Sequence, residues 1–269
     1  MNSTLISAKP DSLVEYLIKI WRNRSLILTL AKRDLKVKYA QTLLGLTWTV
    51  IQPLVAVTIY TLFFAGLMNF KTEEPYILFV LSGILLWNLF NYIFSQGSSS
   101  LTQNQDLIKK LAFPKIILPI SKTILAMVEL SITALLLLAL MIYFQVELRW
   151  SMLLAPFIIL PLVLMSLGLA FTLSAITIEK RDLFHIIPFL VNFGIWLTPV
   201  FYPVSLIPAK YADLLYLNPI ACILQLFRWS LFGGALNPLV LVGISLSFLI
   251  FIIGFFLFKS KEDKIIDVL

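Results

Sequence analysis

The chain has 269 residues, of which 60% are hydrophobic and 13% are charged, and its formal net charge is +7. Soluble domains carry about a quarter charged residues, so this composition excludes a soluble enzyme and indicates that lipid surrounds much of the chain. The single cysteine, Cys222, excludes a disulfide scaffold, and the single histidine, His185, excludes a zinc site built from cysteine and histidine. We therefore expect no bound metal.

Residues 1–47 contain eight Lys or Arg, and we expect no cleavable leader peptide there. The stretch 13–24 is amphipathic, with basic residues opposite an apolar face formed by Leu13, Tyr16, Leu17, Ile20 and Trp21. This pattern predicts a cytosolic region whose helix lies in the membrane interface. The alternative, a helix packed on a cytosolic domain, is disfavoured because the chain offers no such domain.

Six apolar runs are long enough to cross a bilayer, which takes about 20 residues. They cover approximately residues 48–70, 76–96, 116–144, 152–178, 183–202 and 238–258. The predicted fold is therefore an all-α integral membrane protein, with a six-span domain over residues 48–258 and a cytosolic tail over 259–269.

The segment 203–237 separates the fifth run from the sixth and is apolar only in patches, because Pro203, Pro208 and Pro219 interrupt it. Neither patch is long enough to span. We predict two short re-entrant helices in the outer half of the bilayer, with Asn218-Pro219 as the turn between them. Irregular backbone at that depth requires surrounding protein or a wet cavity, which suggests a lined pathway.

Lys and Arg are distributed unequally between the two sides of this arrangement. With six spans, 17 of the 21 fall on the side of both termini, and only Lys71, Arg149, Lys210 and Arg228 fall on the other. Because cytoplasmic loops carry the excess of Lys and Arg, both termini and the loops 98–114 and 179–185 are expected in the cytoplasm. The net charge thus reports topology, and we expect no nucleic-acid partner.

Few residues suggest catalysis. No glycine-rich phosphate loop is present, so we expect no nucleotide hydrolysis by this chain and no enzyme activity. Asp182 and His185 fit a helix start better than a catalytic pair, because no nucleophile lies nearby. Glu129 is the only acid well inside a span, which fits either a proton relay or, more simply, a hydrogen-bonded packing contact.

Aromatic residues recur at helical spacing in the first and fifth runs. They include Tyr60 and Phe63 in the first run and Phe189, Phe193 and Trp196 in the fifth. Because sugars stack on aromatic rings, such a face would suit a glycan path. Lipid-facing or core aromatic residues are the simpler interpretation of the pattern alone.

The cytosolic loop 98–114 carries the signals of a short helix. Ser and Thr open it, Asp106 lies in the first turn, Lys109 and Lys110 lie in the last turn, and Pro114 ends it. Together with the loop 179–185, it is the expected docking point for a cytosolic partner.

Several motifs resemble a known family. Residues 31–39 read A-K-R-D-L-K-V-K-Y, residues 41–48 read Q-T-L-L-G-L-T-W, and Gln52-Pro53-Leu54 follows. Residues 109–115 read K-K-L-A-F-P-K, and further matches are Arg181-Asp182-Leu183, Thr198-Pro199-Val200-Phe201-Tyr202 and Asn218-Pro219. Over nearly its whole length the chain resembles the permease subunit of ABC transporters that export polysaccharides, a family that includes O-antigen, capsule and teichoic-acid exporters.

The resemblance implies a homodimeric channel with two copies of a cytosolic ABC ATPase, which would bind the ATP and Mg, so this chain needs no cofactor. It implies export of a lipid-linked polysaccharide, such as O-antigen, across a bacterial inner membrane. ATPase coupling would fall to Leu101, Asp106, Leu107, Ile108, Lys109, Lys110, Leu111, Arg181 and Asp182. The alternatives are a drug or small-lipid exporter permease, an integral membrane glycan-lipid transferase and a proton-driven carrier.

Overall fold

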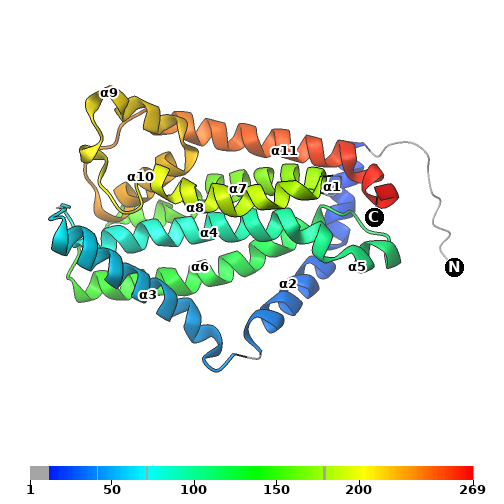
Figure 1. Ribbon diagram of the computed structural model, residues 1–269, viewed down its shortest axis with the longest axis horizontal. Coiled ribbons are helices and arrows are strands. Elements are labelled where there is room, and N and C mark those ends of the chain that lie inside the picture. The colour runs from blue at the N-terminus through cyan, green and yellow to red at the C-terminus, as the bar shows by residue number, and fades with distance from the viewer. Residues whose placement is uncertain (1–11, 41, 71, 178–179, 269) are drawn as a thin grey trace.

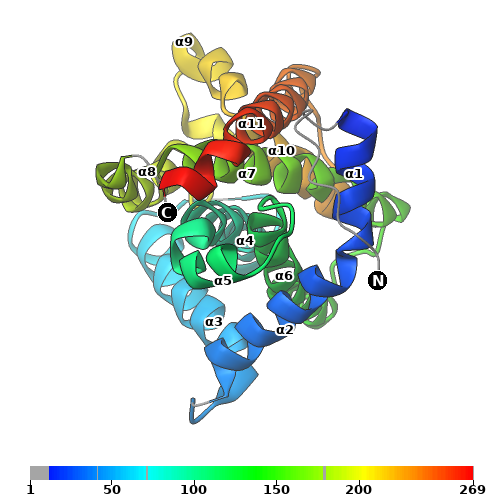
Figure 2. The same ribbon diagram turned by 90° about the vertical axis from the view of Figure 1, so that its right-hand side faces the viewer.

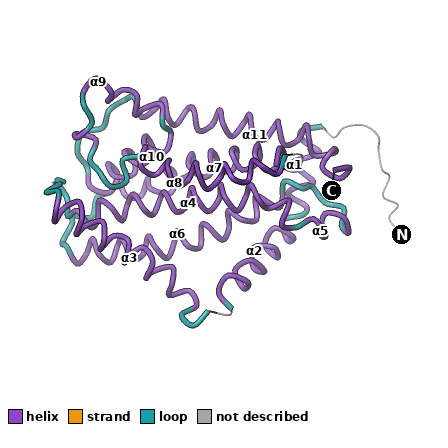
Figure 3. Tube along the Cα trace, in the orientation of Figure 1, coloured by secondary structure: helices purple, strands orange, loops and turns teal. Residues whose placement is uncertain are grey.

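The computed structural model describes residues 12–40, 42–70, 72–177 and 180–268, and every regular element among them is helical (Figure 3). The α-helices are α1 (Leu13–Arg22), α2 (Arg24–Tyr39), α3 (Trp48–Tyr60), α4 (Tyr76–Gln103), α5 (Gln105–Lys110), α6 (Ile117–Tyr143), α7 (Ala155–Thr177), α8 (Ile186–Leu197), α9 (Ala209–Ala212), α10 (Pro219–Phe232) and α11 (Val240–Val268). A π-helical turn, Thr61–Leu67, extends α3. The 3₁₀ turns are Gly45–Thr47, Trp150–Leu154, Arg181–His185, Val204–Leu206 and Asp213–Leu217.

Long helices run side by side and form a bundle (Figure 1). Five apolar helical segments of the described chain are long enough to cross a membrane: Gly45–Leu67, Tyr76–Gln103, Ile117–Tyr143, Trp150–Thr177 and Val240–Glu262. They confirm the first four predicted spans and the last one. Apolar runs of this length form helices in lipid because each backbone polar group then finds its partner within the segment.

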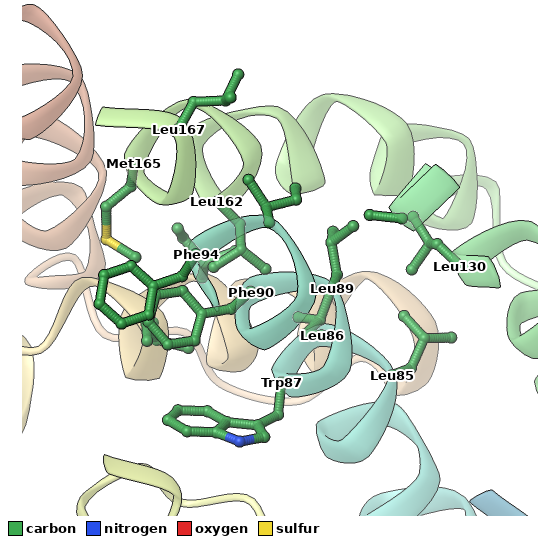
Figure 4. Close-up of a cluster of buried hydrophobic side chains, with 14 of the residues drawn as sticks. Leu85, Leu86, Trp87, Leu89, Phe90, Phe94, Leu130, Leu162, Met165 and Leu167 are labelled. Atoms are coloured by element: carbon green, nitrogen blue, oxygen red, sulfur yellow. The ribbon is translucent and has the colours of Figure 1, made fainter. Parts of the chain in front are cut away.

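The core lies around α4. Within its apolar window 78% of the residues are buried, against 11% for the segment that contains α3. Phe90 and Phe94 of α4 lie beside Leu162 and Met165 of α7 (Figure 4). α4 is therefore the central helix of the bundle, whereas α3 lies at its periphery.

α7 and α11 approach each other closely at two glycines. A Cβ atom on Gly168 would lie 2.6 Å from the carbonyl oxygen of Ile250, and one on Gly254 would lie 2.0 Å from the carbonyl oxygen of Gly168. Only glycine fits at both positions. Small residues allow such backbone contact between membrane helices, which associate through packing because lipid supplies no hydrophobic driving force between them.

The fifth predicted span is too short in the structure. Its apolar helical segment covers Asp182–Leu197 only, and 16 helical residues extend about 24 Å, less than the roughly 30 Å of a bilayer core. The segment that follows contains two helical pieces, Lys210–Leu217 and Pro219–Phe232, which meet at an angle of 97°. The described chain thus has five spanning helices, or six if this bent pair counts as one span.

Three predicted boundaries also change. α4 continues to Gln103, so Leu101 belongs to its last turn and the loop helix is reduced to α5, Gln105–Lys110. The predicted tail from residue 259 onward is the helical continuation of α11 as far as Val268.

α1 begins at a reciprocal cap formed by Ser12 and Glu15. On its predicted apolar face, Leu13, Leu17 and Trp21 are exposed and Ile20 is half-buried. Tyr16, on the same face, is buried, and its hydroxyl donates a hydrogen bond to Glu262.

Candidate functional site

The polar face of α4 is the most informative feature of the bundle. α4 is buried on most sides, yet between Leu81 and Leu101 the residues that stay accessible are Asn88, Asn91, Tyr92, Ser95, Gln96 and Ser99. They recur at steps of three and four, so they form one stripe on one side of the helix. A polar stripe inside a spanning helix is costly against lipid and indicates a wet or polar neighbour.

Two cavities lie along this stripe. The larger, of about 460 Å³, lies between the end of α2, the first turns of α3, and the facing sides of α4 and α6; its lining includes Trp48, Gln52, Asn88, Gln96 and Glu129. We call it the α3–α4–α6 cleft. The smaller, of about 330 Å³, lies between α4 and the start of α8, and its lining includes Ser99, Phe184 and Asn192. Asn91 and Ser95 line both cavities, so the stripe connects them.

Two ion pairs join α2 to α6. Asp34 pairs with Lys122 at 2.6 Å, and Lys38 pairs with Glu129 one turn further along α2. Viewed from the end that carries α5 (Figure 2), α2 runs along the outside of the bundle beside α6, and Tyr16 of α1, the helix before it, packs on Phe255 of α11. The spacing of Asp34 and Lys38 places both on the α6 side of α2, so the charged residues of the predicted signature act as its attachment to the bundle.

Glu129 of α6 finds its polar partners on α2. Its carboxylate accepts from Lys38 and from the hydroxyl of Tyr39, which also lies 3.0 Å from the hydroxyl of Thr49. Burial, and then the bond to Glu129, raise the pKa of Tyr39 to about 12, so its hydroxyl stays protonated at neutral pH. The simpler interpretation, a hydrogen-bonded packing contact, thus fits Glu129, with partners on α2 that are distant in sequence.

Arg33 links α2 to the turn before α5. Its guanidinium donates to the side-chain oxygen of Asn104 at 2.9 Å and to Asp34 at 2.9 Å. Asn104 is buried and precedes the first residue of α5. α2, α5 and α6 are therefore connected through polar side chains at this end of the bundle.

A second polar anchor surrounds Arg228 of α10. Its Nη1 donates to the carbonyl of Pro199 at 2.7 Å, its Nη2 donates to the carbonyls of Phe79 and Val200 at 2.9 Å each, and its Nε lies 3.3 Å from the hydroxyl of Ser82. The guanidinium also stacks over the Phe79 ring, 3.4 Å from the centroid. Arg228 thus ties α10 to α4 and to the segment that leaves α8. Sequence reasoning counted it only as an outer-loop cation.

The predicted aromatic residues fall into two groups. Tyr60 and Trp196 pack on Phe201, with ring centroids 3.9 Å and 5.4 Å away. Phe201 itself is fully buried. Phe189 and Phe193 pack on each other at 4.4 Å on α8 and are more than half exposed, as is Phe63 in the turn after α3. Trp196 is also more than half exposed, although it contacts Phe201.

The residues predicted for ATPase coupling differ in their burial. Asp106, Lys109, Lys110, Leu111 and Asp182 are exposed and Leu107 is half-buried, whereas Leu101 and Ile108 are buried within the chain. Leu101 and Ile108 therefore hold the loop against the bundle, and the exposed residues form its accessible surface. The side chain of Arg181 and residue 179 lie outside the described part of the chain.

The other candidate residues, considered for metal binding or catalysis, form no such site among the described residues. Within the described residues, no three His, Cys, Asp or Glu residues come close enough to hold a metal ion. Cys222 is buried. Asp182 and His185 both lie in the 3₁₀ turn before α8, as a helix start requires.

Comparison with known proteins identifies the class. A family model described as ABC-2 type transporter matches residues 25–232. The chain belongs to this family of membrane components of ABC transporters. The relatives it resembles include the O-antigen export system permease protein RfbA of Myxococcus xanthus, 30% identical over 78% of this chain and 81% of that protein. It also resembles RfbA of Klebsiella pneumoniae, 24% identical over 91% of this chain and 95% of that protein. The polysialic acid transport protein KpsM of Escherichia coli is 20% identical over 87% of this chain and 92% of that protein.

The α4 stripe was missed in the sequence although its signal was present. Asn88, Asn91, Ser95 and Ser99 follow helical spacing within an otherwise apolar run, and a periodicity count of polar residues would have found them. The Arg228 anchor had no such signal, because its partners are main-chain carbonyls of distant segments.

Proposed function

We propose that this chain is the channel-forming permease subunit of an ATP-driven exporter that moves a lipid-linked polysaccharide, O-antigen, across the bacterial inner membrane. The observation that carries the proposal is the accessible polar stripe of α4 inside a spanning helix. Such a stripe suits the transport of a hydroxyl-rich polymer. An exporter of a drug or a lipid would not require it. The names of the O-antigen export relatives give the same substrate class.

The active form we propose is a homodimer with two cytosolic ABC ATPase subunits that bind ATP and Mg. α3 and α8 flank α4 on the same side of the bundle (Figure 2). Their outer faces expose Val55, Ile59, Phe189, Phe193 and Leu197. A second copy facing this side would enclose the polar stripe between two permeases. The exposed surface of α5 would contact the ATPase, and the bent pair ending in α10 would gate the exit as re-entrant helices.

The proposed pathway includes the exposed rings of α8. Replacing Phe189 and Phe193 together by alanine should reduce export more than roughly tenfold, because each ring-face contact contributes about 1 kcal/mol. Neither ring supports the core. Surface glycan is measured in a permease-deletion strain complemented with each variant. The control is Phe157→Ala, which removes a ring on α7 that is 72% exposed, against 58% for Phe189 and 57% for Phe193. Unchanged surface glycan on deletion of the permease would contradict the proposed function itself.

The proposed orientation places both termini and α5 in the cytoplasm, and α1 in the inner leaflet interface. In a Cys222→Ser background, single cysteines at Glu73 and Lys210 should react with an impermeant thiol reagent added to spheroplasts, because both residues are exposed at the end opposite α5. A cysteine at Lys109 should react only after the membrane is permeabilised. Labelling of Lys109→Cys in intact spheroplasts would show that the orientation is opposite to the one proposed.

A further inference from the structure

We propose that the α3–α4–α6 cleft is a binding subsite for one neutral sugar unit of the transported glycan. The proposal rests on the proposed function and adds a place where the glycan is held, separate from the aromatic face of α8. The cleft volume of about 460 Å³ lies within the roughly 300–1,000 Å³ range of small-ligand sites. It is formed within one protomer, by α2, α3, α4 and α6.

The cleft is lined by amide side chains that the protein does not use. Gln52, Asn88 and Gln96 make no side-chain hydrogen bond to any described residue. Each amide offers two donor hydrogens and an acceptor oxygen. A sugar hydroxyl also donates and accepts, so a ring with several hydroxyls satisfies such a set, whereas an acyl chain satisfies none of it.

The backbone adds another acceptor at the same place. Pro53 lies inside α3 and has no N–H, so the carbonyl of Thr49, one turn earlier, loses its usual helical donor. Thr49 and Pro53 both line the cleft. A ligand hydroxyl that reaches this carbonyl would supply the missing donor.

Two aromatic rings stand at the same cleft, and they have different surroundings. Lys38 Nζ lies 4.5 Å from the centroid of Tyr92, so one face of that ring is occupied by a cation. Trp48, in the first turn of α3, is 41% exposed and lines the rim. Trp48 is thus the ring on which a sugar can stack, as amphipathic aromatic side chains do at ligand sites.

The charge of the cleft favours a neutral ligand over a phosphate. Its charged lining residues are Lys38 and Glu129, which pair with each other. An anion would have to break this pair or bind beside a carboxylate, and both cost free energy in a site partly shielded from water. The lipid phosphate of the substrate therefore belongs elsewhere.

The test is site-specific photo-crosslinking in cells that make the glycan. Trp48→p-benzoylphenylalanine keeps an aromatic ring at the rim, and Phe193→p-benzoylphenylalanine reports the α8 face. Phe157→p-benzoylphenylalanine is the control, at an exposed position on α7. After irradiation, the purified permease is probed for covalently attached host glycan. We expect adducts at Trp48 and Phe193 that exceed the Phe157 signal at least tenfold.

The outcomes separate the two proposals. An adduct at Phe193 without one at Trp48 overturns the subsite and leaves the proposed function intact; no adduct at either position overturns both. A second variant combines Gln52→Met, Asn88→Leu and Gln96→Met, which keep approximate size and remove hydrogen bonding. It should reach the membrane at wild-type level, lose the Trp48 adduct and lower export at least tenfold. Wild-type export and adduct yield in this variant would also overturn the subsite.

Discussion

Replacing Ile108 by proline is expected to stop glycan export while the permease still reaches the membrane. The N–H of Ile108 donates to the carbonyl of Asn104 at 3.1 Å and closes the first turn of α5. Proline removes that donor, and its ring clashes with the same carbonyl, at a cost of about 3 kcal/mol or more in a helix. Because α5 has only six residues, this single change removes the rigid helix that we propose as the contact for the ATPase.

The export assay needs a control that separates the helix from the buried side chain. Ile108→Ala keeps the backbone donor and a good helix former, and removes only a side chain that is 4% exposed. We expect it to lower thermal stability in detergent and to retain most export. Co-purification with the ATPase should fail for Ile108→Pro and persist for Ile108→Ala. Normal export by the proline variant would place the coupling contact elsewhere.

Hydropathy predicts correctly the spans in which one helix covers nearly the whole apolar run. The fifth run fails because the apolar sequence continues through a turn: α8 stops at Leu197, and Thr198, Pro199 and Val200 follow in an irregular segment. Val200 and Phe201 are apolar and fully buried, so composition does not distinguish this turn from a helix. The carbonyls of Pro199 and Val200 in this turn accept hydrogen bonds from Arg228, which lies on another helix.

The candidate site shows the same limit. Helical spacing brings Asn88, Asn91 and Ser95 to one face of α4, and that much follows from the sequence. Spacing does not show that Glu129 of α6 would meet Lys38, because the pair depends on how α2 lies against the bundle. The family motif did identify the right segment of α2, but the partners of its charges are visible only in the folded chain.

Replacing Arg228 by methionine is expected to destabilise the permease severely. Methionine keeps the apolar stem and leaves the carbonyls of Phe79, Pro199 and Val200 without this donor in a buried site. An unsatisfied buried polar group costs about 1–3 kcal/mol, so the loss over three carbonyls is about 3 kcal/mol or more. The thermal transition of the purified permease, measured by size-exclusion after heating, should fall by many degrees.

Two further variants test whether the hydrogen bonds of the guanidinium group cause the loss of thermal stability. Arg228→Lys retains a charge but presents its donors from one point, so it should recover only part of the stability. Ser82→Ala removes the longest of the four contacts, 3.3 Å, and should leave the transition nearly unchanged. If the methionine variant unfolds at the same temperature as the wild type, the segment after α8 keeps its turn without Arg228.

Local packing would then be the alternative cause of this turn, because a Cβ on Gly83 would lie 3.0 Å from both the Arg228 guanidinium and the Val200 carbonyl. Gly83→Ala tests that packing directly, since it crowds the same junction while every hydrogen-bonding group remains.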